Sequence, residues 1–231
     1  MEKILEVKDL KTNFYTDEGV IKAVNGLSYD INKGECVGLV GESGCGKSVS
    51  AMSILRLIPY PPGVIEGGQI IFKGENLLEV SEERIQEVRG GRISMIFQEP
   101  STSLNPVLSV QRQLTEMLEL HQGMTSKEAK AESVMLLELV GIPDPERRVL
   151  DYPHQFSGGM QQRIMIAIAL SCSPDLIIAD EPTTALDVTV QAQILELLAD
   201  MRKRLGTAIL IITHNLGVVA RYVERLNVMY A

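Results

Sequence analysis

Aromatic residues are scarce in this 231-residue sequence and tryptophan is absent, so the core must be built from aliphatic side chains. Aromatics make up 4%, against 45% hydrophobic and 23% charged residues, which is an ordinary balance for a globular protein. Basic residues are outnumbered, with a formal net charge of −8, and they are scattered along the chain. A nucleic-acid-binding protein usually carries a basic stripe. We therefore expect no nucleic-acid partner.

The sequence also lacks membrane-spanning and metal-binding patterns. Its most apolar runs, IMIAIAL and AILIIT, fall far short of the roughly 20 residues that a membrane-spanning helix needs. The first ten residues, MEKILEVKDL, contain no signal-peptide apolar core. Cys36, Cys45 and Cys172 cannot all pair, and their spacing matches no metal site. We expect reduced thiols and a cytosolic chain that reaches a membrane only through a partner.

Short β-branched runs alternate with helical patterns, which predicts an α/β fold with a mostly parallel sheet. CVGLV (36–40), LIIAD (176–180) and AILIIT (208–213) lack polar alternation, so we predict central strands buried on both faces. Further strands are predicted at residues 4–9, 24–31, 68–73, 93–97 and 226–230. The early strands and 68–73 alternate more, as in an antiparallel sheet with one solvated face.

The character of the sequence changes between residues 99 and 172. Apolar residues recur at helical spacing in 106–121, 126–141 and 158–171, and no strand pattern intervenes. We predict one nucleotide-binding domain over 1–231. Its core, with an N-terminal antiparallel β subdomain, comprises 1–98 and 173–231. An α-helical subdomain, 99–172, is inserted into that core.

GESGCGKS (41–48) lies between the predicted strand CVGLV and a helical pattern, and it matches the phosphate-binding pattern G-x-x-x-x-G-K-[ST]. Glycines let backbone N–H groups curl around phosphates, Lys47 adds a positive charge, and Ser48 offers a hydroxyl to Mg²⁺. Nucleotide contacts are predicted from Gly41, Glu42, Ser43, Gly44, Cys45, Gly46, Lys47, Ser48 and Val49. The loop alone fits kinases, GTPases and motor ATPases equally. A GTPase would need a base-reading N-K-x-D motif downstream, whereas the similar run NKGE (32–35) lies upstream and ends in the wrong residue.

Polar residues follow three other predicted strands. Asp180 ends LIIAD and is a candidate Mg²⁺ ligand, and the adjacent Glu181 is a candidate base for the attacking water. Gln98 follows ISMIF and is placed to reach a metal-bound water. His214 follows AILIIT and is placed to touch the γ-phosphate or the water. Considered singly, Gln98 could equally be a surface glutamine and His214 a core histidine. The predicted metal ligands are Ser48, Gln98 and Asp180.

A second glycine-rich helix start, FSGGMQQR (156–163), lies far from the first. Ser157 can act as an N-cap, and Gly158 and Gly159 expose backbone N–H groups in the first turn. The stretch lacks the lysine and hydroxyl that would let it hold a nucleotide on its own. It would become useful by closing on a phosphate held elsewhere, although alone it could be an ordinary glycine-capped helix.

Taken in order, GESGCGKS, QEP, FSGGMQQR, LIIADEP, ALD and THN resemble the nucleotide-binding subunit of an ATP-binding cassette (ABC) transporter. The resemblance covers essentially the whole chain. It implies the ABC-type fold of the P-loop NTPases, ATP and Mg²⁺ as cofactors, and Glu181, His214 and Gln98 as catalytic residues. The runs PSTSLNP, GIPDPERRVLDYPHQFSGGM and ADEPTTALDVTVQAQIL are similar to the oligopeptide, dipeptide and nickel importer branch of this family.

The resemblance further implies that two cassettes pack head to tail. ATP on one Walker loop would then meet the partner's signature residues, Ser157, Gly158, Gly159 and Gln161. Asp187, in ALD, would lie along the seam. An aromatic residue would stack on adenine, and the candidates are Phe14 and Tyr15, with Phe14 favoured by its spacing from Leu10.

The implied partners are a second ATPase subunit, identical or related, and permease subunits whose cytoplasmic helix is gripped near Gln98 by the helical subdomain. A substrate-binding protein would act indirectly, and the chain would lie on the cytoplasmic face of the cell membrane. The predicted function is ATP hydrolysis that powers import of oligopeptides or dipeptides, with nickel or another small solute as the alternative cargo.

Two rival functions would require other sequence features. A soluble ABC ATPase of DNA repair or translation would need a long coiled-coil insertion or a basic face. A degenerate regulatory subunit would lack catalytic positions, and every such position is filled. The sequence departs from the family at Glu224, where an aspartate is usual, and it stops at Ala231, where peptide-importer relatives continue. We therefore expect a longer parent chain.

Overall fold

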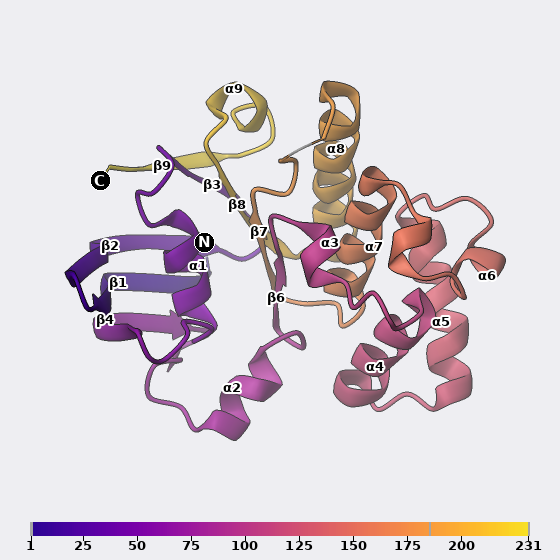
Figure 1. Ribbon diagram of the computed structural model, residues 1–231, viewed down its shortest axis with the longest axis horizontal. Helices are drawn as coiled ribbons and strands as arrows, with labels where there is room; N and C mark the ends of the chain where they lie inside the picture. The colour runs from indigo at the N-terminus through magenta and orange to yellow at the C-terminus, as the bar shows by residue number, and fades with distance from the viewer. Residues whose placement is uncertain (1, 185, 231) are drawn as a thin grey trace.

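Two β-sheets organise the part of the chain that the computed structural model describes, residues 2–184 and 186–230 (Figure 1). The larger sheet has the strand order β6-β7-β8-β3-β9, and all of its pairings are parallel. Its strands are β3 (Cys36–Gly41), β6 (Ile93–Ile96), β7 (Leu176–Asp180), β8 (Ala208–Thr213) and β9 (Arg225–Met229). The predicted central strands are thus β3, β7 and β8, and β7 and β8 are buried along their whole length.

The two faces of this sheet belong to different hydrophobic clusters. Ile178 and Leu210 pack toward the antiparallel sheet, whereas Ile177 and Ile211 pack toward the helices of residues 100–205. Side chains of a strand alternate between its faces, so an uninterrupted apolar run supplies both clusters. This is the physical reason why β7 and β8 show no polar alternation.

The smaller sheet is antiparallel and has the order β2-β1-β4-β5. Its strands are β1 (Lys3–Thr16), β2 (Gly19–Asn32), β4 (Gly63–Phe72) and β5 (Glu75–Asn76). Helix α1 (Lys47–Ile54) packs between the two sheets, because Ala51 and Ile54 share a cluster with Leu5 of β1 and Leu39 of β3. The helix that follows the phosphate-binding loop is therefore held on both sides.

The antiparallel strands are longer than the sequence predicted, and β5 was not predicted at all. β4 begins five residues before the predicted 68–73, because the pair Gly67 and Gly68 interrupts the apolar pattern inside the strand. The register between β1 and β4 shifts at this point. Gly68 has φ +99°, a conformation that favours glycine. The sequence therefore predicted only the part of β4 that follows the bulge and missed the part that precedes it.

Helices fill the whole interval between β6 and β7, and residues 97–175, all described, contain no strand. They are α3 (Pro100–Ser103), α4 (Val110–Gln122), α5 (Ser126–Leu139), α6 (Pro145–Arg148), the 3₁₀ turn η1 (Pro153–Gln155) and α7 (Gly158–Leu170). The others are α2 (Glu82–Val88), α8 (Val188–Leu205) and α9 (Leu216–Val219). Within the described ranges, none combines the length and apolarity needed to cross a bilayer.

The long helices begin where the sequence provides caps. The side chain of Ser109 accepts a hydrogen bond from the backbone of Arg112 at the start of α4, and Thr125 and Glu128 form a capping box at the start of α5. Gly141, with φ +75°, follows the end of α5. Figure 1 shows these helices gathered on the side of the large sheet away from the antiparallel strands.

Gly68→Ala is expected to destabilise the fold. A Cβ at residue 68 would lie 2.6 Å from the carbonyl oxygens of Lys8 and Asp9, in a positive-φ conformation. Such strain costs about 1–3 kcal/mol, and each kcal/mol lowers Tm by about 2–4 °C in a chain of this size. Gly67→Ala is the matched control, because nothing lies within 4 Å of its added Cβ. The Tm values of the two variants are measured by thermal unfolding followed by circular dichroism. Equal Tm values would contradict the close backbone approach at Gly68.

Candidate nucleotide-binding and hydrolysis site

The site lies where four neighbouring parallel strands end. β3 leads into the glycine-rich loop, β6 into Gln98, β7 into Glu181 and β8 into His214. Strands β6, β7, β8 and β3 are consecutive in the sheet. Because parallel strands present their carboxyl ends at the same edge, the sheet order itself gathers these groups.

Residues of this edge line a cleft of about 470 Å³. Nine predicted site residues line it: Ser43, Gly44, Gly46, Lys47, Ser48, Val49, Gln98, Glu181 and His214. Two residues that the sequence did not single out, Ala23 and Thr184, line it as well. The sequence thus predicted most of the cleft wall.

Lys47 is the buried charge of the loop. It is only 5% exposed, and its Nζ donates hydrogen bonds to the carbonyl oxygens of Gly41 at 2.9 Å and Glu42 at 2.8 Å. Helix α1 starts at Lys47 and directs its N-terminal N–H groups toward the loop. The loop therefore combines a fixed ammonium group with the positive end of a helix, which suits a phosphate chain.

Gly46 allows the backbone of the phosphate-binding loop to lie close to strand β2 of the antiparallel sheet. It has φ +93°, and a Cβ there would lie 2.0 Å from the backbone oxygen of Ala23 in β2. Any side chain would push β2 away from the start of α1. The glycine pattern thus reflects a close backbone approach as well as the curvature of the loop.

Ser48 and Asp180 form an oxygen pair suited to a divalent cation. The Ser48 hydroxyl donates to Asp180 Oδ1 at 3.0 Å. Asp180 is 5% exposed, and this burial raises the pKa of its carboxyl group, a change that the Ser48 bond and Lys47 oppose. A bound cation would supply the missing countercharge, and oxygen ligands of this kind suit Mg²⁺. The third predicted ligand, Gln98, instead donates to Glu181.

Three side chains converge on the carboxylate of Glu181. Thr184 Oγ1 donates to Oε2 at 2.8 Å, Gln98 Nε2 donates to the same oxygen at 3.3 Å, and His214 Nδ1 lies 3.0 Å from Oε1. The backbone of Glu181 has φ +47°, which is uncommon for a residue with a Cβ. Its N–H nevertheless donates to the Ile212 oxygen of β8, so the strained residue is tied to the sheet.

These contacts keep Glu181 ionised. Burial acts to raise the pKa of its carboxyl group, but the hydrogen bonds from His214 and Thr184 outweigh burial, and the pKa lies below its usual value. An ionised carboxylate facing the cleft can accept a proton from water or orient it. Glu181 therefore has the state and the support that the predicted base requires.

The two candidate adenine-stacking residues, Phe14 and Tyr15, project from opposite faces of β1. Thr12, two residues earlier in β1, is buried and bonded to Ser53 of α1, so Phe14 projects from the same face of the strand. Tyr15 projects from the other face, and its hydroxyl donates to Glu66 at 2.5 Å. Neither aromatic residue lines the cleft within the described ranges.

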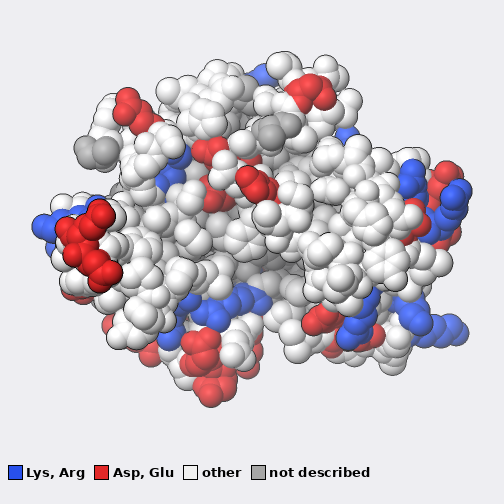
Figure 2. Space-filling model, in the orientation of Figure 1, with Lys and Arg blue, Asp and Glu red and all other residues white. Residues whose placement is uncertain are grey.

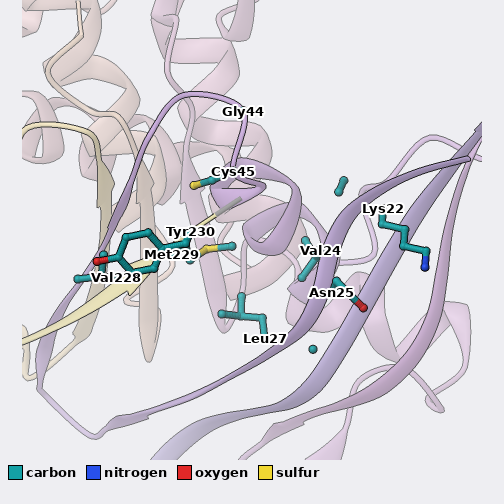
Figure 3. Close-up of a pocket in the computed structure, with 11 residues that line it drawn as sticks. Lys22, Val24, Asn25, Leu27, Gly44, Cys45, Val228, Met229 and Tyr230 are labelled. Atoms are coloured by element: carbon teal, nitrogen blue, oxygen red, sulfur yellow. The ribbon is translucent and has the colours of Figure 1, made fainter.

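Cys45 belongs to the loop but turns its side chain away from the cleft. It lines a neighbouring pocket of about 420 Å³, formed by β2, the loop and the end of the chain (Figure 3). Met229 and Tyr230 line the same pocket. Cys45 is thus not among the described residues that line the cleft, and its contact with the nucleotide stays a prediction.

The predicted signature residues and Asp187 lie elsewhere in the same chain. Ser157 caps α7, with its side chain accepting from the Met160 backbone, and Asp187 caps α8 in the same way through the Val190 backbone. Gly158 is exposed in the first turn of α7. None of these residues is among the described residues lining the cleft.

The comparisons with known proteins agree with this geometry. A family profile described as "ABC transporter" matches residues 24–184. The chain belongs to the ABC transporter family. It is 57% identical to a probable peptide ABC transporter ATP-binding protein of Sinorhizobium fredii and 54% identical to an oligopeptide transport ATP-binding protein of Bacillus subtilis. Each match covers 99% of this chain, which spans about two thirds of these relatives, 68% and 64% of their lengths.

The fold is likewise that of an ABC cassette. The dimeric, post-hydrolysis structure of the ATP-binding cassette MJ0796, bound to ADP and Pi, superposes with a TM-score of 0.86 at 27% identity, covering 97% of this chain and 94% of that one. The family match and this likeness confirm the resemblance and the fold class predicted from the motifs. The chain is an ABC ATPase domain, and ATP is its nucleotide.

Thr184 is one of the two cleft-lining residues that the motifs did not predict, and Ala23 is the other. The only sequence signal for Thr184 was its position three residues after Glu181, the spacing at which a side chain in a turn folds back on the first residue. Glu224, the departure from the family pattern, instead accepts a hydrogen bond from Arg202 at 2.6 Å, and it is not among the described residues lining the cleft.

Thr184→Val is expected to lower kcat about ten-fold while ATP affinity stays near wild type. Valine keeps the side-chain shape but removes a hydrogen bond to a carboxylate, which is worth about 1.5–3 kcal/mol. Thr184→Ser keeps the hydroxyl and should retain activity. Steady-state ATPase assays and nucleotide titrations measure both quantities. Unchanged kcat in the valine variant would show that Thr184 does not position Glu181.

Proposed function

We propose that this chain is the ATP-hydrolysing subunit of an importer that carries peptides across the cell membrane. The observation that carries the proposal is the ionised Glu181, held by Thr184, Gln98 and His214 at the rim of the phosphate-binding loop. The relatives named above are described as peptide and oligopeptide transport proteins, which favours peptides over nickel or another solute as cargo.

In this proposal each group at the edge of the sheet has a role in hydrolysis. The loop and Lys47 hold the phosphates. Ser48 and Asp180 would hold Mg²⁺, which would offset charge on the phosphate oxygens when bound. Glu181 accepts a proton from the attacking water. Gln98 and His214 face the γ-phosphate from the neighbouring strand ends and orient that water. Phe14 stacks on the adenine ring.

We propose further that two such chains close head to tail around ATP, as homodimer or heterodimer. A single chain keeps Ser157, Gly158 and Asp187 outside its own cleft, at two helix N-termini that suit an anion. The second chain supplies them to complete the site. The similar cassette MJ0796 was solved as a dimer, which supports this arrangement.

Glu181→Gln is expected to bind ATP, to form a stable dimer and to hydrolyse ATP at least about a hundred-fold more slowly than wild type. The amide keeps the shape of the side chain but cannot take a proton. Size-exclusion chromatography with light scattering, with and without Mg·ATP, measures the dimer. If the variant stays monomeric with ATP bound at high concentration, the shared-site proposal fails.

A groove beside Gln98 is the proposed docking surface for a permease helix. It measures about 230 Å³ and is mostly apolar, with Leu57, Met95, Phe97, Leu104 and Met165 among its lining residues. It lies between β6, the segment that follows α1, and the helices α3, α4 and α7. Figure 2 shows a hollow of largely uncharged surface in the middle of this face. An apolar hollow of this kind suits the apolar side of a helix.

Leu57→Asp is expected to abolish association with permease-containing vesicles and to leave the basal ATPase rate of the isolated chain unchanged. Leu57 is 36% exposed in the groove, so a charge there would repel an apolar helix without disturbing the core. Leu120→Asp, at a residue 72% exposed on α4 that does not line the groove, is the control. Flotation of vesicles containing the co-expressed permease subunits compares them; equal binding would rule out this groove.

The cargo is tested in the parent cell, since other subunits select it. Deletion of the gene should abolish uptake of a radiolabelled peptide, and a plasmid copy with Lys47→Ala should fail to restore it. Retained peptide uptake with lost nickel uptake would favour the alternative cargo. In this arrangement the chain sits on the cytoplasmic face of the membrane, and a substrate-binding protein acts through the permease.

A further inference from the structure

The chain builds the starts of α7 and α8 with the same hydrogen-bonded frame. In α7 the fourth helical residue is Gln161, and its Nε2 donates to the carbonyl oxygens of Pro153 at 2.8 Å and Phe156 at 3.2 Å. These oxygens lie eight and five residues before the glutamine. The amide side chain therefore folds back across the turn that precedes its own helix.

In α8 the fourth helical residue is Gln191, and its Nε2 donates to the carbonyl oxygens of Thr183 and Leu186, both at 3.1 Å. Here too the acceptors lie eight and five residues before the glutamine. Asp187 caps this helix as Ser157 caps the other, each four residues before its glutamine. We call these two arrangements the α7 clamp, made by Gln161, and the α8 clamp, made by Gln191.

The backbone of each clamp repeats as well. Phe156 N donates to Pro153 O at 3.1 Å, and Leu186 N donates to Thr183 O at 3.4 Å. In both cases the first carbonyl accepts from the backbone and from the glutamine together. A glutamine amide has two donors and a fixed planar shape, so one side chain sets the spacing of two carbonyl oxygens.

The two clamped turns lie against each other. A Cβ on Gly159 would be 3.0 Å from Cγ1 of Val190, and one on Gly158 would be 4.0 Å from Cδ2 of Leu186. Figure 1 shows α7 and α8 side by side. The glycines of the signature stretch therefore allow α7 to approach α8, and the two glutamines fix the turns that meet there.

Each clamp bears on a different part of the proposed site. The Thr183 oxygen held by Gln191 belongs to the residue before Thr184, whose hydroxyl holds Glu181 at 2.8 Å. The Phe156 oxygen held by Gln161 belongs to the residue before Ser157, the cap of the exposed signature turn. The α8 clamp therefore fixes the backbone next to the residue that holds the chain's own Glu181. The α7 clamp fixes the backbone next to Ser157, in the signature turn that would contact a second chain.

We propose that Gln161 and Gln191 are positioning residues for ATP hydrolysis, one acting on the partner's nucleotide and the other on the chain's own Glu181. The inference rests on the proposed head-to-tail dimer and adds to it. It also changes the role predicted for Gln161, whose amide nitrogen is used inside its own chain. The Gln161 side chain instead fixes the backbone that precedes the signature turn, through its hydrogen bonds to Pro153 and Phe156.

Gln161→Glu and Gln191→Glu test the clamps, because a carboxylate cannot donate to the two carbonyl oxygens and repels them. Each variant should lower kcat by about ten- to a hundred-fold, the cost of misplacing reacting groups by about 1 Å. The Kd for ATP should stay within about two-fold of wild type, since the phosphate loop is untouched. Gln86→Glu is the control, because Gln86 is exposed on α2 and makes no side-chain hydrogen bond with the described residues.

Mixing each variant with Glu181→Gln separates the two clamps. A mixed dimer of Gln161→Glu with Glu181→Gln has one complete site, formed by the first chain's Glu181 and the second chain's unaltered signature turn. Its ATPase rate should match that of a mixed dimer of wild type with Glu181→Gln, which also has one complete site. A mixed dimer of Gln191→Glu with Glu181→Gln has no complete site, and its ATPase rate should not exceed that of the Gln191→Glu variant alone. A loss of helix stability alone would not produce this difference.

Rescue of both variants, or of neither, would overturn the assignment, as would kcat values equal to wild type in the unmixed variants. If a glutamate variant fails to fold, Gln→Met at the same position removes the donor without adding charge and is put through the same mixtures. A wild-type chain that neither hydrolyses ATP nor dimerises would remove the proposed function itself. A wild-type chain that does both, with unimpaired clamp variants, would remove only the clamps.

Discussion

Parallel pairing of β7 with β8, and of β8 with β3, is the constraint on which the site depends. It brings the glycine loop, Glu181 and His214 to one edge of the sheet, although they are far apart in the sequence. The pairing is stable because the strands are apolar on both faces and covered on both sides. The chemistry at the edge therefore depends on burial well away from it.

The charged groups at this edge are balanced in different ways. Lys47 is satisfied by backbone oxygens of its own loop, and Glu181 is satisfied by three neighbouring side chains. Among the described residues, Asp180 accepts one side-chain hydrogen bond, from Ser48, and although Lys47 also favours its charged form, burial raises the pKa of its carboxyl group. This difference explains why the same edge can offer both a base that is already ionised and a position suited to a cation.

Reading the sequence located the central strands and the nine predicted residues of the cleft wall, because glycine patterns and apolar runs are local signals. It missed the first half of β4, where a glycine pair interrupts the pattern, and it missed Thr184 and Ala23. The positions of Thr184 and Ala23 in the cleft depend on which segments meet after folding. The same holds for the hydrogen-bond acceptors of the Gln161 side chain. The division into a core and a 99–172 helical subdomain remains a prediction, since α7 shares a cluster with the core strands.

The left-handed backbone at Glu181 carries a further consequence for anyone seeking a more heat-resistant version of this protein. A non-glycine residue at φ +47° stores conformational energy, and glycine there would relieve it. That replacement would also delete the carboxylate. Selection for durability and selection for turnover therefore oppose each other at one residue, and a library screened only for thermal survival would be enriched in inactive proteins.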